Sequence, residues 1–290
     1  MSYGPNPWQQ AHWDWRAAGN FVCGGAGSGL LAFTALSGAR GPAAMLLLLG
    51  GLSLVGLGLL CVWLEIGRPL RALHVFFNPR TSWMTREGFV ALLLFAAGLA
   101  AAAGAGGLAW VTWVTWATWV TALLALAFVY CQGRILKASR GIPAWREPAI
   151  VPLIVATGLA EGGGLFLLTH PLHGLGTQAM MAAFAAALMV RWLAWLSYRR
   201  RLATGAAPRA LAQLDRAGAV LQTFGTYLAF ALVAPAGIGL VGGSVAGLLA
   251  ALAGLAAAVT GAWLKYTLIT RAAYNQGFAL AHLPVRGARL

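Results

Sequence analysis

Long apolar runs separated by short polar and basic segments make up almost all of this sequence. The runs cover 17–64, 88–133, 148–190 and 217–264, and each is long enough for two membrane-spanning helices of roughly 20 residues. Near the middle of each run lies a turn rich in Gly or Pro: SGARGP, AGAGGL, HPLHGLG or GLVGGS. The pattern therefore predicts eight transmembrane helices arranged as four hairpins.

The predicted fold is an all-α integral membrane protein, with residues 1–290 forming one membrane domain of two four-helix bundles. Helices one to four occupy 17–133, and helices five to eight occupy 148–270. The composition agrees, because 60% of the residues are hydrophobic, only 9% are charged and the mean hydropathy is +0.76. A globule of this size cannot bury so much apolar surface, so the chain belongs in a bilayer.

Basic residues gather at one end of the predicted helices. Of the 20 Lys and Arg residues, all except Arg40 lie near the N-terminus, in 65–87, 134–147 and 191–216, or from Lys265 onward. Because Lys and Arg in short loops are retained in the cytoplasm, both termini are predicted to be cytoplasmic. This basic collar suits two partners, anionic membrane lipid and a soluble subunit, and the sequence favours neither. Nucleic acid is not expected, because there is no soluble basic domain to bind it.

The side chains that hold redox cofactors do not lie at membrane depth in this sequence. A b-type haem needs paired mid-span histidines, and an iron–sulfur cluster needs closely spaced cysteines. His170 and His173 have a spacing that suits a metal, but Pro171 between them favours an ordinary interfacial turn. We therefore expect no haem, iron–sulfur cluster or metal site in this chain.

Two features inside the predicted spans have different interpretations. GNFVCGGAGSG at 19–29 has the glycine content of a nucleotide-binding loop, but no strand precedes it, so we expect close helix packing instead. Glu161 lies in the fifth predicted span, where an ionisable group costs about 2.5–3.5 kcal/mol and usually has a partner or a role. Glu161 is therefore a candidate for a proton path, either beside a redox site or as the coupling acid of a secondary transporter.

Charged and hydrogen-bonding groups are densest in LEIGRPLRALHVFFNPRTSWMTREGF, residues 64–89. This stretch joins the second and third predicted helices, and it has Glu65 near its start and Glu87 near its end. RPLRALHVFF has the spacing of a helix that lies in the membrane interface, and NPRTSW ends that helix. Arginines alone would fix the orientation of the chain, so His74 and the two carboxylates at membrane level indicate an additional role.

The same stretch resembles the signature between the second and third spans of NrfD/DmsC/PsrC-type membrane subunits. These proteins anchor molybdopterin oxidoreductases and exchange electrons with quinone. ILKASRGIPAWREP at 135–148 and LKYTLITRAAYNQGFALAHLPVRG at 264–287 are similar to two further segments of that family, and its DmsC-like members have eight spans. GPNPWQQAHWDWRAAGNF near the N-terminus resembles the membrane subunit of phenylacetyl-CoA:acceptor oxidoreductases.

The resemblance implies a subunit of the bacterial inner membrane that reacts with ubiquinone or menaquinone. Its partners would be a ferredoxin-like iron–sulfur subunit and a molybdopterin catalytic subunit, both on the cytoplasmic side. Quinone chemistry moves two electrons and two protons, so it needs groups that can exchange protons. The resemblance assigns that role to Glu65 and Glu87, although DmsC itself has histidine at the position of Glu65.

Further polar residues near the same end are candidates for the site. Asn20, His74 and Tyr130 are expected to help bind the quinone. Arg68, Arg71 and Arg80 are expected to hold the loop, pair with the acids or contact the partner subunit. Two other function classes remain open: a proton-coupled secondary transporter, and a structural anchor without a quinone site.

Overall fold

The computed structural model describes residues 4–66, 69–107 and 113–278, with only the backbone described for 69–71. Eight helical segments in these ranges are long and apolar enough to cross a membrane. They are α1 (Trp15–Leu36), α2 (Gly41–Glu65), α3 (Trp83–Ala105), α4 (Val114–Ala138), α6 (Ile150–Leu168), α8 (Gln178–Leu202), Pro208–Gly237 and Gly243–Arg271. For the described part of the chain, the prediction of an all-helical fold with eight helices that could span a membrane is thus confirmed.

The last two segments are continuous helices with a local change of hydrogen-bond pattern. The seventh consists of α9 (Pro208–Val220), the π-helix η2 (Leu221–Leu228) and α10 (Ala229–Gly237). The eighth consists of α11 (Gly243–Tyr266) and the π-helix η3 (Thr267–Arg271). Short π-helical insertions often mark sites under a local constraint.

Three short elements connect the long helices: η1 (Pro69–Phe77), α5 (Pro143–Arg146) and α7 (His170–His173). The interfacial helix expected in RPLRALHVFF is the 3₁₀ helix η1. A hydrogen bond from Thr85 Oγ1 to the Val75 carbonyl fastens η1 to the first turn of α3. That turn is capped by Ser82, whose hydroxyl accepts from the Thr85 amide at 3.3 Å.

The histidines that were expected in a turn lie in the single helical turn α7. Leu175 N donates to His173 Nδ1 at 3.1 Å, so Nε2 carries the proton that faces the Phe166 carbonyl at 3.0 Å. Burial lowers the pKa of His173. His173 is therefore a neutral structural group that ties α7 to the end of α6.

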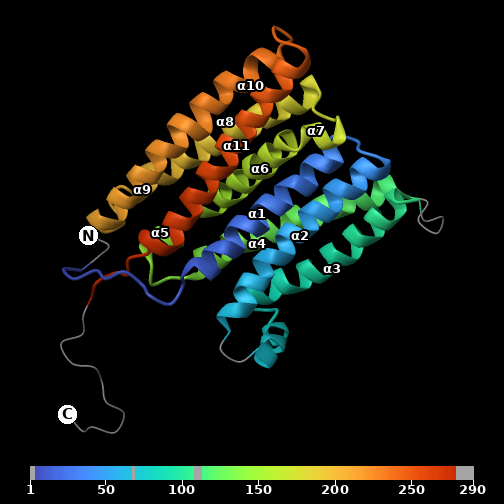
Figure 1. The fold of residues 1–290 in the computed structure, drawn as a ribbon. Helices are drawn as coiled ribbons and strands as arrows, with labels where there is room; N and C mark the ends of the chain where they lie inside the picture. The colour runs from blue at the N-terminus through green and yellow to red at the C-terminus, as the bar shows by residue number, and fades with distance from the viewer. Residues whose placement is uncertain (1–3, 67–68, 108–112, 279–290) are drawn as a thin grey trace, which may run out of the picture.

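The helices α1 and α6 form the centre of the molecule (Figure 1). The first of them contacts α2, α4, α6 and α11, and α6 also contacts α4, α8 and α11. In Figure 1, α2, α3 and α4 lie on one side of this central pair, and α8, α9, α10 and α11 lie on the other.

Glycines allow the two central helices to approach closely. A Cβ atom on Gly29 of α1 would lie 2.1 Å from the Gly158 carbonyl oxygen of α6, and one on Gly162 would lie 2.1 Å from the Leu30 nitrogen. Gly25 and Gly29 are four residues apart, as are Gly158 and Gly162, which is the spacing of small-residue helix contacts in membranes. The close packing predicted for 19–29 is thus confirmed.

Substitution Gly162→Ala should force α1 and α6 apart, because the added methyl group meets backbone atoms that cannot rotate away. We expect a loss of about 1–3 kcal/mol, seen as a lower unfolding temperature in detergent. The matched control is Gly50→Ala on α2, where the nearest atom to a new Cβ is 3.8 Å away. Equal unfolding temperatures for the two variants would contradict this account of the interface.

Two basic residues assigned to the collar belong instead to the helix interior. Arg191 and Lys265 are both fully buried, so their assignment was wrong. The Arg191 guanidinium donates to the Ala257 carbonyl at 2.9 Å and to the Gly225 carbonyl of the π-helical segment. It thereby joins α8, η2 and α11 by satisfying main-chain oxygens inside the bundle.

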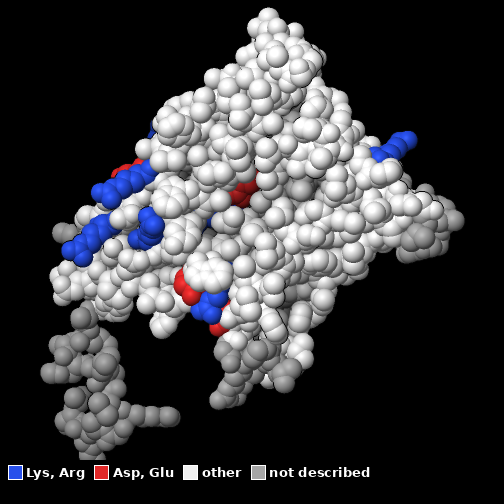
Figure 2. All heavy atoms as spheres, in the orientation of Figure 1, with Lys and Arg blue, Asp and Glu red and all other residues white. Residues whose placement is uncertain are grey.

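The two ends of the described chain run beside each other. Gly4 N donates to Gln276 O at 2.6 Å, and Gln10 N donates to Ala273 O at 2.9 Å. Both ends therefore lie at the end of the bundle that carries α5 and α9 (Figure 1). Figure 2 shows basic side chains gathered at that same end on the face drawn.

Candidate functional site

Two cavities meet at Glu87, near the end of α2 and the beginning of α3. The first, of about 200 Å³, is lined by the polar side chains of Asn20, Glu65 and Glu87 and by the aromatic rings of Trp13 and Phe21. It lies between α1, α2 and α3, with further wall residues from α4. We call it the polar cavity.

The second cavity, of about 280 Å³, is lined by apolar side chains of α2, η1 and α3, such as Trp63, Phe76 and Phe95. We call it the apolar cavity. It shares four lining residues with the polar cavity: Val62, Ile66, Met84 and Glu87. Glu87 thus lies between a cavity whose otherwise apolar wall contains Asn20 and Glu65 and a second cavity whose other lining residues are apolar.

Glu87 faces inward from α3, and only 5% of it is exposed. Its Oε1 accepts from Asn20 Nδ2 of α1 at 3.5 Å, and it also hydrogen-bonds with the Gln132 side chain of α4. Gln132 Nε2 donates to the Asn20 carbonyl at 2.9 Å. Side chains of α1 and α4 therefore hold this carboxylate of α3, which also lines both cavities.

A glycine on α1 makes room for this cluster. A Cβ on Gly24 would lie 2.5 Å from Gln132 Nε2, and one on the neighbouring Gly25 would lie 2.2 Å from Lys265 Nζ. The glycine-rich stretch 19–29 thus serves two purposes, because it admits both a neighbouring helix and two buried polar side chains.

Glu65 is the last residue of α2 and lies at the rim of the polar cavity. The adjacent Leu64 carbonyl accepts from Arg16 at 2.9 Å, and Arg16 forms an ion pair with Asp14 at 2.9 Å. These hydrogen bonds from Arg16 hold the pKa of Asp14 below its usual value. The same pair fixes the end of α2 against the start of α1, which positions Glu65.

The other predicted quinone ligands lie away from both cavities. His74 of η1 is exposed and packs edge-on against Phe77, with ring centres 5.3 Å apart. Tyr130 is 39% exposed, and its hydroxyl accepts from Arg134 at 2.7 Å. Neither lines the polar or the apolar cavity, so the structure brings together Asn20, Glu65 and Glu87 of the predicted set.

The predicted loop arginines are only partly described. Arg80 is exposed, and its carbonyl accepts from Arg86 at 2.7 Å. Arg68 and the side chain of Arg71 lie outside the described residues. Arg86 instead forms, with Arg134, a pair of cations over the Trp83 ring, at 4.2 and 4.1 Å from its centre.

Sequence reasoning missed Gln132 and Met84. Gln132 is the single side-chain amide in the apolar run 88–133, and this was the available signal, since such groups in membrane spans usually have a polar partner. Met84 lines both cavities, but nothing in the sequence distinguishes it from a packing residue.

Glu161, the candidate for a proton path, forms a buried ion pair on the other side of α1. Its Oε2 lies 2.6 Å from Lys265 Nζ, and each side chain is 1% exposed. Lys265 Nζ also donates to the Phe21 carbonyl at 2.9 Å. Glu161 Oε1 is buried and has no hydrogen-bond partner among the described residues.

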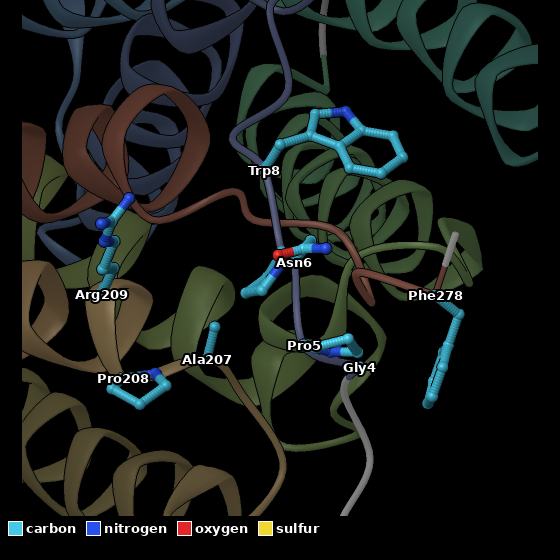
Figure 3. A pocket seen from close by; sticks show the side chains of 9 residues that line it. Gly4, Pro5, Asn6, Trp8, Ala207, Pro208, Arg209 and Phe278 are labelled. Carbon is cyan, nitrogen blue, oxygen red and sulfur yellow. The ribbon is translucent and has the colours of Figure 1, made fainter. Parts of the chain in front are cut away.

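A larger cavity, of about 1030 Å³, lies at the end of the bundle where the two ends of the described chain run beside each other. Figure 3 shows its lining, with Arg209 of α9 on one side and Phe278 on the other, and Asn6 and Trp8 of the N-terminal segment between them. Arg209 is the one ionisable side chain among the described residues that line it. Those residues include no carboxyl group such as the ones in the polar cavity.

In the described ranges, no three His, Cys, Asp or Glu side chains are grouped so that they could hold a metal ion. No protein-family model and no curated protein matches this sequence.

Proposed function

We propose that this chain is the membrane anchor and quinone-reactive subunit of a multisubunit oxidoreductase. The observation that carries the proposal is the position of Glu87 between a polar and an apolar cavity. A quinone has the same division, with a polar ring that exchanges protons and an apolar isoprenoid tail. In this assignment the ring occupies the polar cavity and the first part of the tail occupies the apolar one.

The chemistry of the polar cavity suits that substrate. Reduction of a quinone adds two electrons and two protons, and Glu65 and Glu87 are two groups that can exchange protons with the ring oxygens. Asn20 supports Glu87 from behind, through its hydrogen bond. The aromatic side chains of Trp13 and Phe21 supply flat surfaces against which a planar ring can pack.

The electrons exchanged with the quinone must pass to or from a second subunit that carries a redox centre. We assign that role to a ferredoxin-like iron–sulfur subunit connected to a molybdopterin catalytic subunit, as the sequence resemblance implies. In that resemblance the organic substrate, such as phenylacetyl-CoA, belongs to the catalytic subunit. The basic end of the bundle supports docking there, since exposed Arg and Lys attract an acidic partner or anionic lipid.

The proposed orientation places this basic end, and both termini, in the cytoplasm of a bacterial inner membrane. Arg40, between α1 and α2, then lies on the external side. The eight spans form four hairpins in this topology. Both cavities that meet at Glu87 lie near the cytoplasmic surface, within reach of a docked electron carrier.

A proton-coupled secondary transporter is the second candidate, and the buried Glu161 is the observation that favours it. A transporter does not explain the two cavities at Glu87, because Glu161 lines neither of them and is paired with Lys265 instead. A structural anchor without a quinone site is the third. It leaves the polar cavity with its two carboxylates unexplained.

A photoreactive quinone with an isoprenoid tail tests the proposal directly. With the purified chain in lipid nanodiscs, we expect cross-links within 59–95, the range that contains all of the described lining residues of the apolar cavity. Excess unlabelled quinone should abolish them, and an isoprenoid probe without the quinone ring should label this segment less. The substitution Glu87→Gln should reduce labelling, whereas Glu147→Gln, at an acid outside both cavities, should not. Uniform labelling of the outer helix surfaces would contradict the proposal.

A further inference from the structure

Glu87 is held on its protein side by two side-chain amides. Asn20 Nδ2 donates to Glu87 Oε1 at 3.5 Å, and Gln132 supplies a second hydrogen bond. All three side chains are buried. In this arrangement the carboxylate accepts and both amides donate, which is the pattern that suits the ionised form of Glu87.

Both amides also keep an oxygen atom that receives no hydrogen bond. Asn20 Oδ1 and Gln132 Oε1 are buried and have no donor among the described residues. Buried polar atoms are nearly always paired, so two unpaired acceptors beside one carboxylate require an explanation. A proton on Glu87 provides a donor for one of them, because a carboxylic acid has one O–H donor that a carboxylate lacks.

The two amides differ in their freedom to rotate. Gln132 Nε2 is bound to the Asn20 carbonyl at 2.9 Å and fills the space left by Gly24, so reversing this amide would break that bond. Among the described residues, the side-chain amide of Asn20 makes one hydrogen bond, the one to Glu87. Because its oxygen has no donor, reversing it breaks only that bond.

We propose that Asn20 is a positioning residue whose side-chain amide reverses when Glu87 takes up a proton. Nδ2 then serves the carboxylate and Oδ1 serves the carboxylic acid, so Glu87 has a hydrogen-bond partner in both states. Gln132 keeps the α1 backbone that carries Asn20 in place.

This inference rests on the proposed function, in which the proton is exchanged with a quinone. During oxidation of a hydroquinone both of its O–H bonds break: one proton forms an O–H bond on Glu87, and the other passes to Glu65, the second carboxyl of the cavity. The electrons leave to the iron–sulfur partner, and reduction of the quinone runs the same proton transfer backward.

Other ionisable groups around Glu87 come from three helices. Glu65 of α2 lines the same cavity. Cys131 of α4 interacts electrostatically with Glu87, and Arg86 and Arg134 interact with Cys131. Glu65 is a second carboxyl that could titrate at this site, so the test is made both in the natural chain and with Glu65→Gln.

Infrared difference spectra of the purified chain in nanodiscs, taken between mildly acidic and mildly alkaline buffer, test the inference. We expect a carboxylic acid band that persists with Glu65→Gln and is lost with Glu87→Gln. The substitution Asn20→Leu should move this band to higher wavenumber, because the acid loses its acceptor. The control Gln222→Leu, which removes an amide bonded to the Gly218 carbonyl, should leave the band in place. An unmoved band in a folded Asn20→Leu protein would overturn the inference.

A second measurement needs no substitution at Asn20. With asparagine labelled with nitrogen-15, its side-chain amide band should change with pH in the natural chain and stay constant with Glu87→Gln. A constant band in both would also overturn the inference. Quinone cross-linking on the same samples distinguishes the proposed function from the role of Asn20. If the spectra change as expected but the quinone does not cross-link, the proposed function alone is refuted. If the quinone cross-links but the bands do not move, the role of Asn20 alone is refuted.

Discussion

Substitution Glu161→Gln should destabilise this protein by about 3–5 kcal/mol, and Lys265→Met should have a similar but smaller effect. Glu161 Oε2 lies 2.6 Å from Lys265 Nζ, and each of the two side chains is 1% exposed. Removal of one partner leaves the charge of the other buried without compensation. Loss of Glu161 is the worse case. It leaves Lys265 and the nearby Arg191 as two buried cations, whereas loss of Lys265 leaves Glu161 under the influence of Arg191.

Unfolding of each variant in detergent, followed by circular dichroism, measures these effects. The double variant Glu161→Gln with Lys265→Met should recover much of the lost stability, because neither charge of the pair then remains unpaired. The control is Asp215→Asn, which breaks the more exposed ion pair between Arg199 and Asp215 and should cost at most about 1 kcal/mol. If Glu161→Gln lowered the stability no more than Asp215→Asn does, the buried ion pair would not contribute to the stability of the fold.

The long helices could be predicted because the membrane imposes a simple rule on the sequence. Backbone groups in the hydrocarbon region must be satisfied within the helix, so each spanning segment appears as an apolar run of nearly fixed length. The change to π-helical hydrogen bonding at Leu221–Leu228 has no such signal. It depends on tertiary partners such as Arg191, which donates to the Gly225 carbonyl.

The buried positions of Arg191 and Lys265 could not be predicted from charge counting. A basic residue near the end of an apolar run looks the same whether its helix ends there or continues. The residues after Lys265 include the uncharged stretch YTLIT, and the helix continues to Arg271. Only the packed structure places Lys265 against α1 and α6.

The candidate site was predictable in part. Asn20, Glu65 and Glu87 are polar residues near the same predicted membrane surface, and they line one cavity. His74 has the same sequence signature, but the 3₁₀ geometry of η1 leaves it on the exposed surface. Gln132 was missed because the sequence gives no indication of which face of α4 meets Asn20.

Substitution Glu87→Gln should reduce quinone-linked turnover of the assembled complex by well over ten-fold. Glutamine keeps the shape of the side chain but removes the exchangeable proton, and general acid–base assistance contributes about 10²–10⁴-fold in rate. The substitution Glu65→Gln should also lower this activity, since Glu65 lines the same cavity. The assembly of the complex should survive both changes, because the helix contacts of α2 and α3 stay intact.

The most direct measurement compares two activities of the complex: turnover with a membrane quinone, and turnover with an artificial soluble electron acceptor that bypasses the membrane subunit. With Glu87→Gln we predict a loss of the quinone-linked activity alone, and with Glu147→Gln no loss of either. A parallel fall of both activities would indicate a role in assembly. Unchanged quinone-linked turnover in both Glu87→Gln and Glu65→Gln would contradict the assignment of the quinone site.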